Sequence, residues 1–425
     1  MATRPPSARG RSRRPLIALV AAHGVSLTGN VLTLIALPLY VLTETGSAAA
    51  TGLTGAAATV PVVLGGAFGG VLVDRLGYRR ASVLADLASG VSIGLVPLLD
   101  ATVGLSFPAL LALVVLTGLL DTPGEMARSA LLPAAAEVAG TPLERAVGLF
   151  EAVERGARLL GAPLAGVGVA LLGPLTVLAL DAGTFVLSAG LVARWVPAAL
   201  GAVAVDESAG GYWRQLRQGL TFTLREPLLR ALVLLVLLTN MFDAAKGTVL
   251  LPVYADRELG GAVAFGLIVG AMAGGAVVGS LTFSAVGHRL PRRATFVLAF
   301  ALAGGPPYFA LAAGLPLPGI LAVTLLSGLG AGAINPIIGA VKLERVPAGM
   351  RARVYGLIGA GAWAAMPVGS LLGGVAVEQV GLRTTLVAVG LAYVLLVLTP
   401  LLGGPWRELR RPESEPAGRA ERLGA

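Results

Sequence analysis

The stretch from Gly69 to Arg80 reads GGVLVDRLGYRR and places one acidic and three basic residues in an otherwise apolar part of the chain. The segments on both sides are long enough to cross a bilayer, which takes about 20 apolar residues in a helix. Charged side chains between two such segments stay in water at the membrane surface. The stretch therefore predicts two membrane helices joined by a tight polar turn.

The composition extends this prediction to the whole chain. Of its 425 residues, 56% are hydrophobic and only 13% are charged, and the mean hydropathy is +0.83. Soluble helices need a polar face, and soluble domains carry about 25% charged residues. The sequence thus predicts an all-α integral membrane protein. It has no cysteine, and His23 and His288 are far apart, so we expect no disulfide, no metal site and no cofactor.

The net charge of +9 fits a positively charged cytoplasmic surface better than a nucleic-acid partner, which would require a soluble basic face. Residues 1–15 form a basic arm. The apolar run that follows is too long for a signal-peptide core and lacks a clear cleavage site. We interpret it as the first spanning helix, with the N-terminus in the cytoplasm.

Twelve spanning helices are predicted. Their ranges are 16–42, 47–73, 80–99, 106–125, 145–172, 175–196, 229–254, 262–286, 294–313, 317–340, 352–377 and 382–402. With this count the external connections hold only two basic residues, Arg257 and Arg383, and Lys246 lies inside a helix. The remaining basic residues fall on one side, which predicts that both termini are cytoplasmic. The expected location is the inner (plasma) membrane of a bacterium.

The chain divides into two similar halves. We expect a six-helix bundle over 16–196, a cytoplasmic linker with an amphipathic helix over 197–228, a second bundle over 229–402 and a disordered cytoplasmic tail over 403–425. Four pairs of segments recur in order at a nearly constant displacement: Leu37–Tyr40 with Leu251–Tyr254, Arg79-Arg80 with Arg292-Arg293, Pro123 with Pro336, and Arg145–Leu149 with Arg353–Leu357. A duplicated bundle of this kind is typical of secondary transporters.

The residues of the charged turn have separate physical roles. Gly70 lets another helix approach closely, and Gly77 allows the positive φ of a tight turn. Asp74 can face the positive end of a helix in the other half. The arginines at 75, 79 and 80 hold the turn in the cytoplasm and can pair with carboxylates. Together they predict a latch between the halves that opens when the halves rock, although a loop that only fixes topology is the alternative.

In these residues the chain resembles the major facilitator superfamily, whose signature loop is G-x-L-A-D-R-x-G-R-R/K; Tyr78 takes a position usually given to a basic residue. The looser segments Thr122–Pro133, Leu180–Gly190 and Val346–Leu357 resemble its drug, macrolide and siderophore exporters. The fifth helix, with Gly156, Gly161, Pro163 and Gly166, resembles the antiporter signature G-P-x-x-G-G, but Ala162 and Val167 replace two of its glycines. Residues 111–120 lack the fourth-helix arginine of many proton-coupled exporters, which leaves the coupling mechanism open.

Ionisable and amide groups inside the bilayer are costly, so each is a functional candidate. Asn240, Asp243 and Lys246 lie on one face of the seventh helix. Asp243 is either a proton-binding carboxylate or half of a neutralised bridge with Lys246. The other candidates are Asn30, Asp181 and Trp363. Asn30 either faces Asn240 across a central cavity or only packs helices together, and Asp181 is either structural or coupling. Trp363 can contribute to the cavity wall, although plain helix packing is favoured for it.

Two further expectations concern the basic loop. Asp121 and Glu125 are the expected carboxylate partners of Arg79 or Arg80, and Asp86 is also expected to pair with this loop.

The leading hypothesis is export of amphipathic small molecules by alternating access in exchange for protons, by a monomer in the lipid bilayer. An importer that works by proton symport is the closest alternative. An enzyme is disfavoured, because the chain shows neither clustered acids for Mg²⁺ nor a nucleophile with a partnered base. ATP-driven pumping is disfavoured because the phosphate-binding pattern G-x-x-x-x-G-K-[ST] is missing.

Overall fold

The computed structural model describes residues 12–201, 212–347 and 350–409. Within them every regular element is a helix, and twelve helical segments are long and apolar enough to span a membrane. The predicted number of spans is therefore confirmed. The first six are α1 (Arg14–Thr45), α2 (Ala48–Leu76), α3 (Tyr78–Thr102), α4 (Phe107–Ala139), α5 (Leu143–Leu172) and α6 (Pro174–Trp195).

The remaining spans include two that are built from several helical segments. The seventh runs through α8 (Pro227–Ala245), the π-helical turn η2 (Lys246–Leu250) and α9 (Leu251–Glu258). α10 (Ala262–Val286), α11 (Arg292–Ala312) and α12 (Leu317–Arg345) follow. The eleventh consists of α13 (Arg351–Trp363) and α14 (Met366–Val380), and α15 (Leu382–Leu398) begins the last. A helix labelled α7 (Tyr212–Arg225) precedes α8.

Glycines with positive φ join several helices with almost no loop between them. Gly173, between α5 and α6, has φ 81° and ψ 159°. Gly381 takes nearly the same angles, φ 84° and ψ 158°, between α14 and α15. These turns occupy matching places in the two halves of the chain, so the repeat that is visible in the sequence extends to the backbone.

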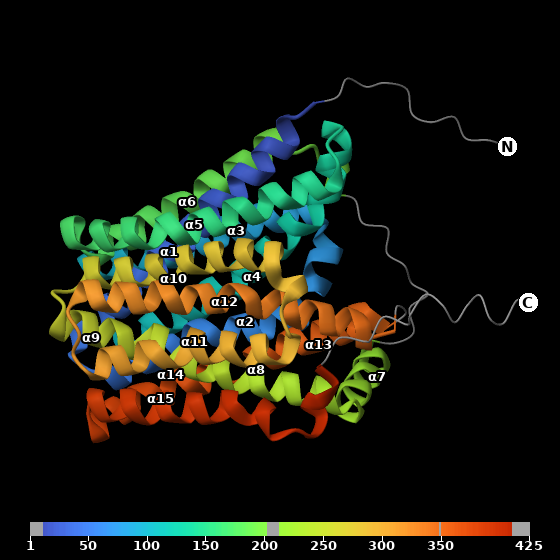
Figure 1. Cartoon of the computed structure of the whole chain (residues 1–425). Coiled ribbons are helices and arrows are strands. Elements are labelled where there is room, and N and C mark those ends of the chain that lie inside the picture. The colour runs from blue at the N-terminus through green and yellow to red at the C-terminus, as the bar shows by residue number, and fades with distance from the viewer. Residues whose placement is uncertain (1–11, 202–211, 348–349, 410–425) are drawn as a thin grey trace, which may run out of the picture.

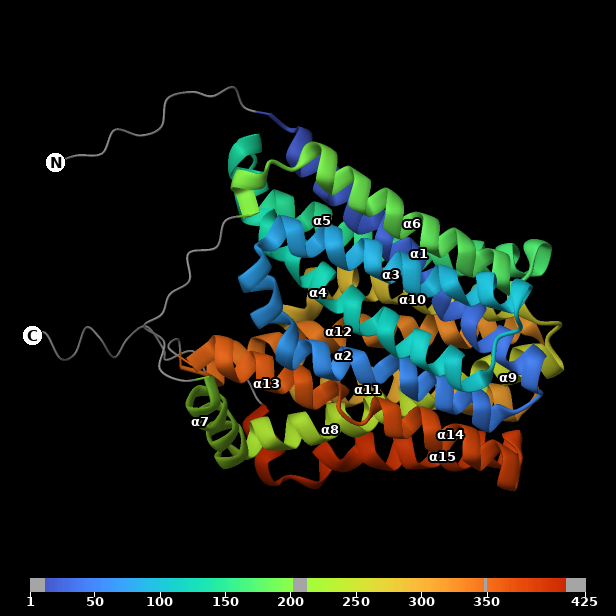
Figure 2. The same ribbon diagram turned by 180° about the vertical axis from the view of Figure 1, so that it is seen from behind.

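The first six spans and the last six lie on opposite sides of the molecule. In Figures 1 and 2, α1, α5 and α6 lie on one side and α8, α14 and α15 on the other. α5 packs against α10 and α2 packs against α14, which gives two equivalent contacts between the halves.

Small residues allow the backbones to meet at these contacts. A Cβ atom added to Gly166 of α5 would lie 2.5 Å from the carbonyl oxygen of Ala262, and one added to Gly270 would lie 2.6 Å from Cγ of Pro163. Gly161 faces α1 instead, because a Cβ there would meet Val31 at 3.2 Å. Gly156 has open space at its Cβ position. Gly166 and Pro163 of the fifth-helix motif therefore belong to the contact between the halves.

The contacts between the halves are concentrated at one end of the molecule. We call the end at which α1 begins the terminal face and the opposite end the far face. At the far face, Glu378 of α14 accepts hydrogen bonds from Ser47 Oγ and, at 3.0 Å, from the backbone N–H of Ala49. Both donors stand at the N-terminus of α2, where a carboxylate is favourable. These two hydrogen bonds join a side chain of the second half to the first half at the far face.

The structure corrects the expected C-terminal tail. Gly404–Leu409 forms a 3₁₀ turn. Trp406 is buried, and its ring centroid lies 6.1 Å from that of Phe296. The prediction of a disordered tail from residue 403 was therefore wrong for these first residues, because Trp406 packs against Phe296 of α11 and Leu409 is buried. Residues 410–425, like 1–11 of the basic arm, lie outside the described residues.

The fourth helix is longer than predicted and brings a buried cation into the first half. α4 continues beyond residue 125 because Ala127, Leu131 and Ala135 are buried against neighbouring helices. Arg128, on this extension, is fully buried and forms a 2.5 Å ion pair with Asp86 of α3. Asp86 therefore does not pair with the basic loop as predicted, and the statement that the fourth helix lacks an arginine was wrong.

Two serines complete this buried pair. Ser188 of α6 donates a hydrogen bond to Asp86 at 2.7 Å, and Arg128 donates one to Ser26 of α1 at 3.1 Å. The cluster of Ser26, Asp86, Arg128 and Ser188 joins four helices of the first half. Since an unpaired buried charge is very costly, the pair fixes how α3 and α4 face each other.

Replacing Arg128 with Met is expected to lower the free energy of unfolding by about 3–5 kcal/mol, because it leaves the Asp86 carboxylate buried without a cation. The double variant Arg128→Met/Asp86→Asn is expected to recover most of that loss. Thermal unfolding of the detergent-purified protein measures both. Arg155→Met removes a surface arginine and serves as the control. An Arg128→Met protein as stable as this control would contradict the stabilising role of the buried pair of Arg128 and Asp86.

Candidate functional site

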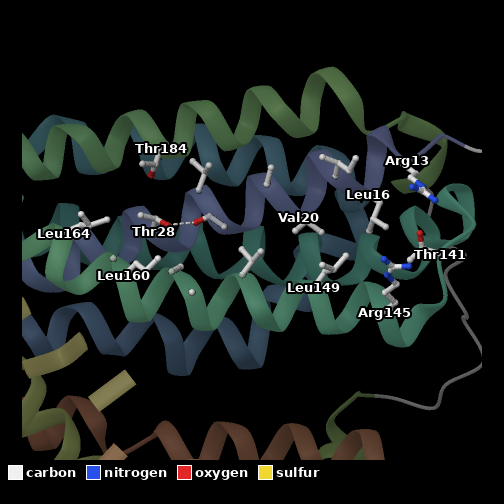
Figure 3. Close-up of a pocket in the computed structure, with 18 residues that line it drawn as sticks. Arg13, Leu16, Val20, Thr28, Thr141, Arg145, Leu149, Leu160, Leu164 and Thr184 are labelled. Carbon is white, nitrogen blue, oxygen red and sulfur yellow. Dashed lines mark hydrogen bonds between the residues drawn. The ribbon is translucent and has the colours of Figure 1, made fainter. Parts of the chain in front are cut away.

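Two large cavities lie in the described part of the chain. One, about 920 Å³ in volume, runs between α1 and α5 within the first half (Figure 3). The other, about 740 Å³, lies between the two halves. The second, which we call the central cavity, takes its walls from both copies of the repeat. This is the position that a rocking-bundle transporter needs for its binding site.

The walls of the central cavity are mostly apolar, with threonines and a few ionisable groups among them. Its aliphatic and aromatic wall includes Val31, Leu34, Leu37, Val62, Ile93, Val114, Leu251, Ile268, Met272, Pro307, Leu311, Ile320 and Trp363. Its polar residues are Asn30, Thr33, Thr51, Thr54, Thr117, Asp121, Thr122, Glu125, Arg158, Lys246, Thr248 and Thr324. Such a surface suits a ligand with a large apolar body and few polar groups.

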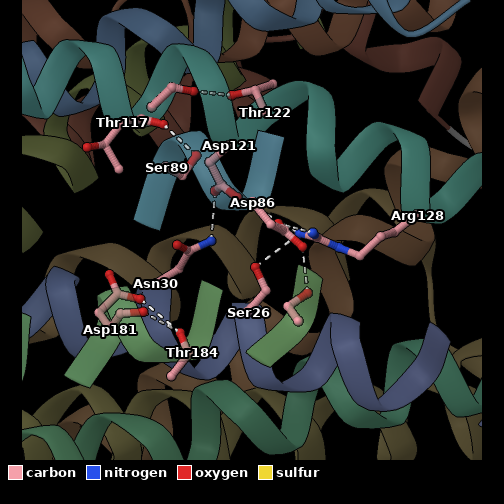
Figure 4. Close-up of polar contacts among 12 residues, drawn as sticks. Ser26, Asn30, Asp86, Ser89, Thr117, Asp121, Thr122, Arg128, Asp181 and Thr184 are labelled. Atoms are coloured by element: carbon pink, nitrogen blue, oxygen red, sulfur yellow. Dashed lines mark hydrogen bonds and ion pairs between the residues drawn. The ribbon is translucent and has the colours of Figure 1, made fainter. Parts of the chain in front are cut away.

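Asp121 of α4 is the carboxylate with the most extensive polar contacts in the cavity wall. Asn30 of α1 donates a 2.9 Å hydrogen bond to its Oδ2 atom (Figure 4). Its Oδ1 atom lies 3.9 Å from Arg128 and has no hydrogen-bond partner in the described part of the protein. Asp121 therefore connects the cavity to the buried cluster around Arg128, and its Oδ1 atom is buried without a hydrogen-bond donor in the described part of the protein.

These contacts exist because glycine keeps the inner side of α4 open. A Cβ atom at Gly124 would lie 3.0 Å from Ala85 and 3.4 Å from a carboxylate oxygen of Asp86. With hydrogen in place of a side chain, α3 comes close enough for Arg128 to reach Asp86.

A second carboxylate lies directly behind the cavity wall. Asp181 of α6 is buried and accepts hydrogen bonds from Thr33 at 2.5 Å and from Thr184 at 3.1 Å (Figure 4). Thr33 itself lines the central cavity. The hydroxyl group of Thr33 thus lies between Asp181 and the cavity, and both carboxylate oxygens of Asp181 accept hydrogen bonds.

In the second half, Lys246 lines the cavity from the π-helical turn η2. Its ammonium group lies 2.6 Å from Asp243 and 5.2 Å from the ring centre of Tyr308. The expected pair between Asp243 and Lys246 is therefore present, whereas its chemical role stays a prediction. Trp363 lines the same cavity, with 44% of its surface exposed, rather than serving helix packing alone.

The predicted approach of Asn30 and Asn240 was wrong. Asn240 of α8 donates a 2.8 Å hydrogen bond to the backbone carbonyl of Ala362 and does not line the central cavity. The hydrogen bond ties α8 to α13 near the break in the eleventh span. Asn30 is instead engaged by Asp121.

The expected partners of the basic loop were also wrong. Arg79 donates a 2.5 Å hydrogen bond to the backbone carbonyl of Ala193 on α6, and Arg80 is exposed. Asp121 and Glu125 line the central cavity, and Asp121 is engaged by Asn30.

The turn itself has the backbone that its sequence requires. Gly77 has a φ of 77° between α2 and α3, a conformation that strongly favours glycine. Gly70, Asp74 and Arg75 lie in the last turns of α2, and their side chains are outside the described residues.

Sequence reasoning missed Arg128. The signal was present in the chain, because Asp86 and Asp121 both fall inside apolar helices and need a cation. Residues 126–139 are also rich in alanine and leucine, which favours a helix that continues past the lipid boundary.

Comparison with known proteins agrees with this architecture. The family model described as Major Facilitator Superfamily matches residues 19–262 and 235–424 of this chain. A protein of Mycolicibacterium fortuitum named "Multidrug efflux pump Tap" is 32% identical over 410 residues, covering 93% of this chain and 97% of that protein. A protein of the same name from Mycobacterium tuberculosis is 31% identical over 412 residues, covering 94% and 96% of the two chains.

Solved structures share the fold at low identity. The nucleoside transporter NupG aligns with a TM-score of 0.75 at 11% identity, over 93% of this chain and 98% of that one. A POT family transporter in complex with 5-aminolevulinic acid aligns with a TM-score of 0.72 at 14% identity, over 94% and 97%. Together with the twelve spans and the duplicated halves, these matches show that the chain is a multi-pass membrane protein that belongs to the Major Facilitator Superfamily.

Proposed function

We propose that this protein exports amphipathic small molecules through the central cavity by alternating access, in exchange for protons. The observation that carries the proposal is the apolar cavity between two repeated bundles, which side chains join at the far face. The relatives named as multidrug efflux pumps support export rather than import. A proton symporter that imports a solute would use the same fold, but the predominantly apolar wall favours an amphipathic cargo.

The proposal places the protein in the inner membrane of a bacterium, with the terminal face on the cytoplasmic side. The protein is proposed to act there as a monomer. Basic residues support this orientation, because Arg79, Arg80, Arg145, Arg345 and Arg351 all lie near helix ends at the terminal face. Basic residues concentrate on the cytoplasmic side of membrane proteins. With this orientation, the latched far face corresponds to a cavity that is closed to the outside.

The charges in the cavity favour a neutral or cationic cargo. Arg158 pairs with Glu154 at 2.8 Å, and Lys246 pairs with Asp243, so both cations have a carboxylate partner. Glu125 lines the cavity, is half-buried and forms no ion pair with a described residue. A carboxylate without a cation in an apolar cavity attracts positive charge strongly.

Asp121 is the carboxylate best placed for proton coupling. It faces the cavity, where it can exchange a proton with water, and it also contacts Asn30 and Arg128. Binding of a cationic cargo and binding of a proton to Asp121 would each reduce the negative charge of the same wall. The two events therefore compete, as an antiporter requires.

Filling the cavity tests the transport proposal. Cells that express the unmodified protein are expected to accumulate less of a lipophilic fluorescent cation, such as ethidium, than cells without it. Ala273→Trp projects an indole into the cavity from α10 and is expected to abolish this effect. Ala322→Trp, at an exposed position of α12 outside the two large cavities, is the control. Equal accumulation with and without the unmodified protein would contradict export of such cargo.

Proton coupling is tested in proteoliposomes with an imposed pH gradient. Asp121→Asn cannot release a proton, so it is expected to remove the acceleration by the gradient while keeping cargo exchange at equal pH. Asp243→Asn is the matched variant in the second half. Loss of the gradient response in Asp243→Asn alone would move the coupling site to the pair of Asp243 and Lys246.

The loop between α2 and α3 is proposed to act as the cytoplasmic latch. Asp74→Asn is expected to slow efflux by about fivefold, since one carboxylate at a helix N-terminus contributes up to about 1 kcal/mol. Membrane insertion should be unchanged. Asp256→Asn, at an exposed site near the far face, is the control. Efflux by Asp74→Asn at the unmodified rate would leave the loop with a topological role alone.

A further inference from the structure

The cavity between α1 and α5 is separate from the central cavity. The two have no lining residue in common. Its walls come from α1, from α5 and the residues just before it, and from Thr184 of α6, all in the first half. We call it the α1–α5 groove. Since it lies outside the walls that a transported molecule would contact, it needs its own explanation.

The body of the groove is apolar and accessible. Ile17, Leu160 and Leu164 line it with 63%, 63% and 64% of their surface exposed. Gly24 and Gly156 contribute no side chain and so leave room between the helices. A surface of this kind in a membrane protein is covered by hydrocarbon.

One end of the groove is cationic. Figure 3 shows Arg13, Arg145 and Thr141 together at the terminal face, with the leucines extending away from them. Both arginines are exposed. Neither forms an ion pair within the described residues, although the neighbouring Arg14 lies over the ring of Trp195, at 5.6 Å. Two guanidinium groups at the mouth of an apolar groove complement an anionic head with a hydrocarbon tail.

The α1 side of the groove matches one leaflet of a bilayer. It extends from Arg13, just before α1, to Thr28, which is about 22 Å at 1.5 Å per residue. Half of a bilayer, including its headgroups, is about 20–22 Å thick. A lipid whose phosphate lies at Arg13 and Arg145 would therefore bring the end of its acyl chain to about Leu160 on α5.

We propose that the α1–α5 groove is a binding site for one anionic phospholipid of the cytoplasmic leaflet. The phosphate accepts hydrogen bonds from Arg13 and Arg145, and one acyl chain fills the space beside Gly156. The proposal uses the orientation given above, in which the terminal face is cytoplasmic. A cationic cargo is disfavoured here, because the two guanidinium groups repel it.

The site is tested with the full chain reconstituted in vesicles of equal parts dioleoyl-phosphatidylglycerol and dioleoyl-phosphatidylcholine. After extraction into detergent, native mass spectrometry counts the lipids that each protein molecule retains. The unmodified protein is expected to retain one phosphatidylglycerol in preference to phosphatidylcholine. Arg13→Gln and Arg145→Gln are each expected to weaken this retention about fivefold.

Two variants separate the groove from the general charge of the surface. Gly156→Leu fills the groove without meeting any atom at its Cβ position, and it should reduce lipid retention with both arginines in place. Gly148→Leu has the same free space at Cβ but lies outside the groove, and Arg14→Gln removes a neighbouring charge. Both controls should retain phosphatidylglycerol as the unmodified protein does.

Three results would overturn the proposal. The first is equal retention of the two lipids, and the second is unchanged retention in the double variant Arg13→Gln/Arg145→Gln. The third is displacement of phosphatidylglycerol by ethidium, which would make the groove a cargo site. None of these measurements requires transport, so failure of the lipid site and failure of the export proposal are distinguishable.

Discussion

The close approach of backbones where α5 crosses α10 and α2 crosses α14 is the constraint on which the remaining structure depends. Two bundles that present only leucine and valine to each other would gain little from association in lipid, since lipid tails are equally apolar. Gly166, Gly52 and Gly374 lie at crossings where a Cβ atom would meet the opposite backbone. These crossings hold the halves together, and the central cavity lies between the same halves.

The two halves have diverged in how they use their polar groups. In the first half, Asp86, Arg128, Ser26 and Ser188 satisfy one another away from the cavity, and Asp121 extends this cluster to the cavity wall. In the second half, Lys246 lines the cavity wall itself, paired with Asp243 and beside the ring of Tyr308. A duplicated scaffold thus carries a rigid charged core on one side and an accessible ion pair on the other.

The sequence was sufficient to predict features that depend on local chemistry or on the number of long apolar segments. Long apolar segments gave the twelve spans, and the positive φ of Gly77 follows from its place between two helices. Features that depend on which side of one helix faces its neighbour could not be predicted from the sequence. Whether Asn30 faces Asn240 or Asp121 is decided by the crossing of α1 with α4. The end of α4 was misplaced for a related reason, because tertiary burial of Ala127 and Leu131 extends the helix beyond the point where apolar composition alone would end it.

The π-helical turn at Lys246–Leu250 has a consequence for which changes the seventh span can accept. A π turn holds one residue more than an α turn, so removing any single residue there would restore a regular α-helix. Because a π turn advances about as far around the helix axis as the shorter α turn, α9 would keep its orientation relative to α8 and Tyr254 would stay buried. Only the side chains of the turn itself, such as Lys246 and Thr248 at the cavity wall, would change position. The extra residue thus lets the seventh span alter its cavity-facing side chains without disturbing the packing of the segments on either side.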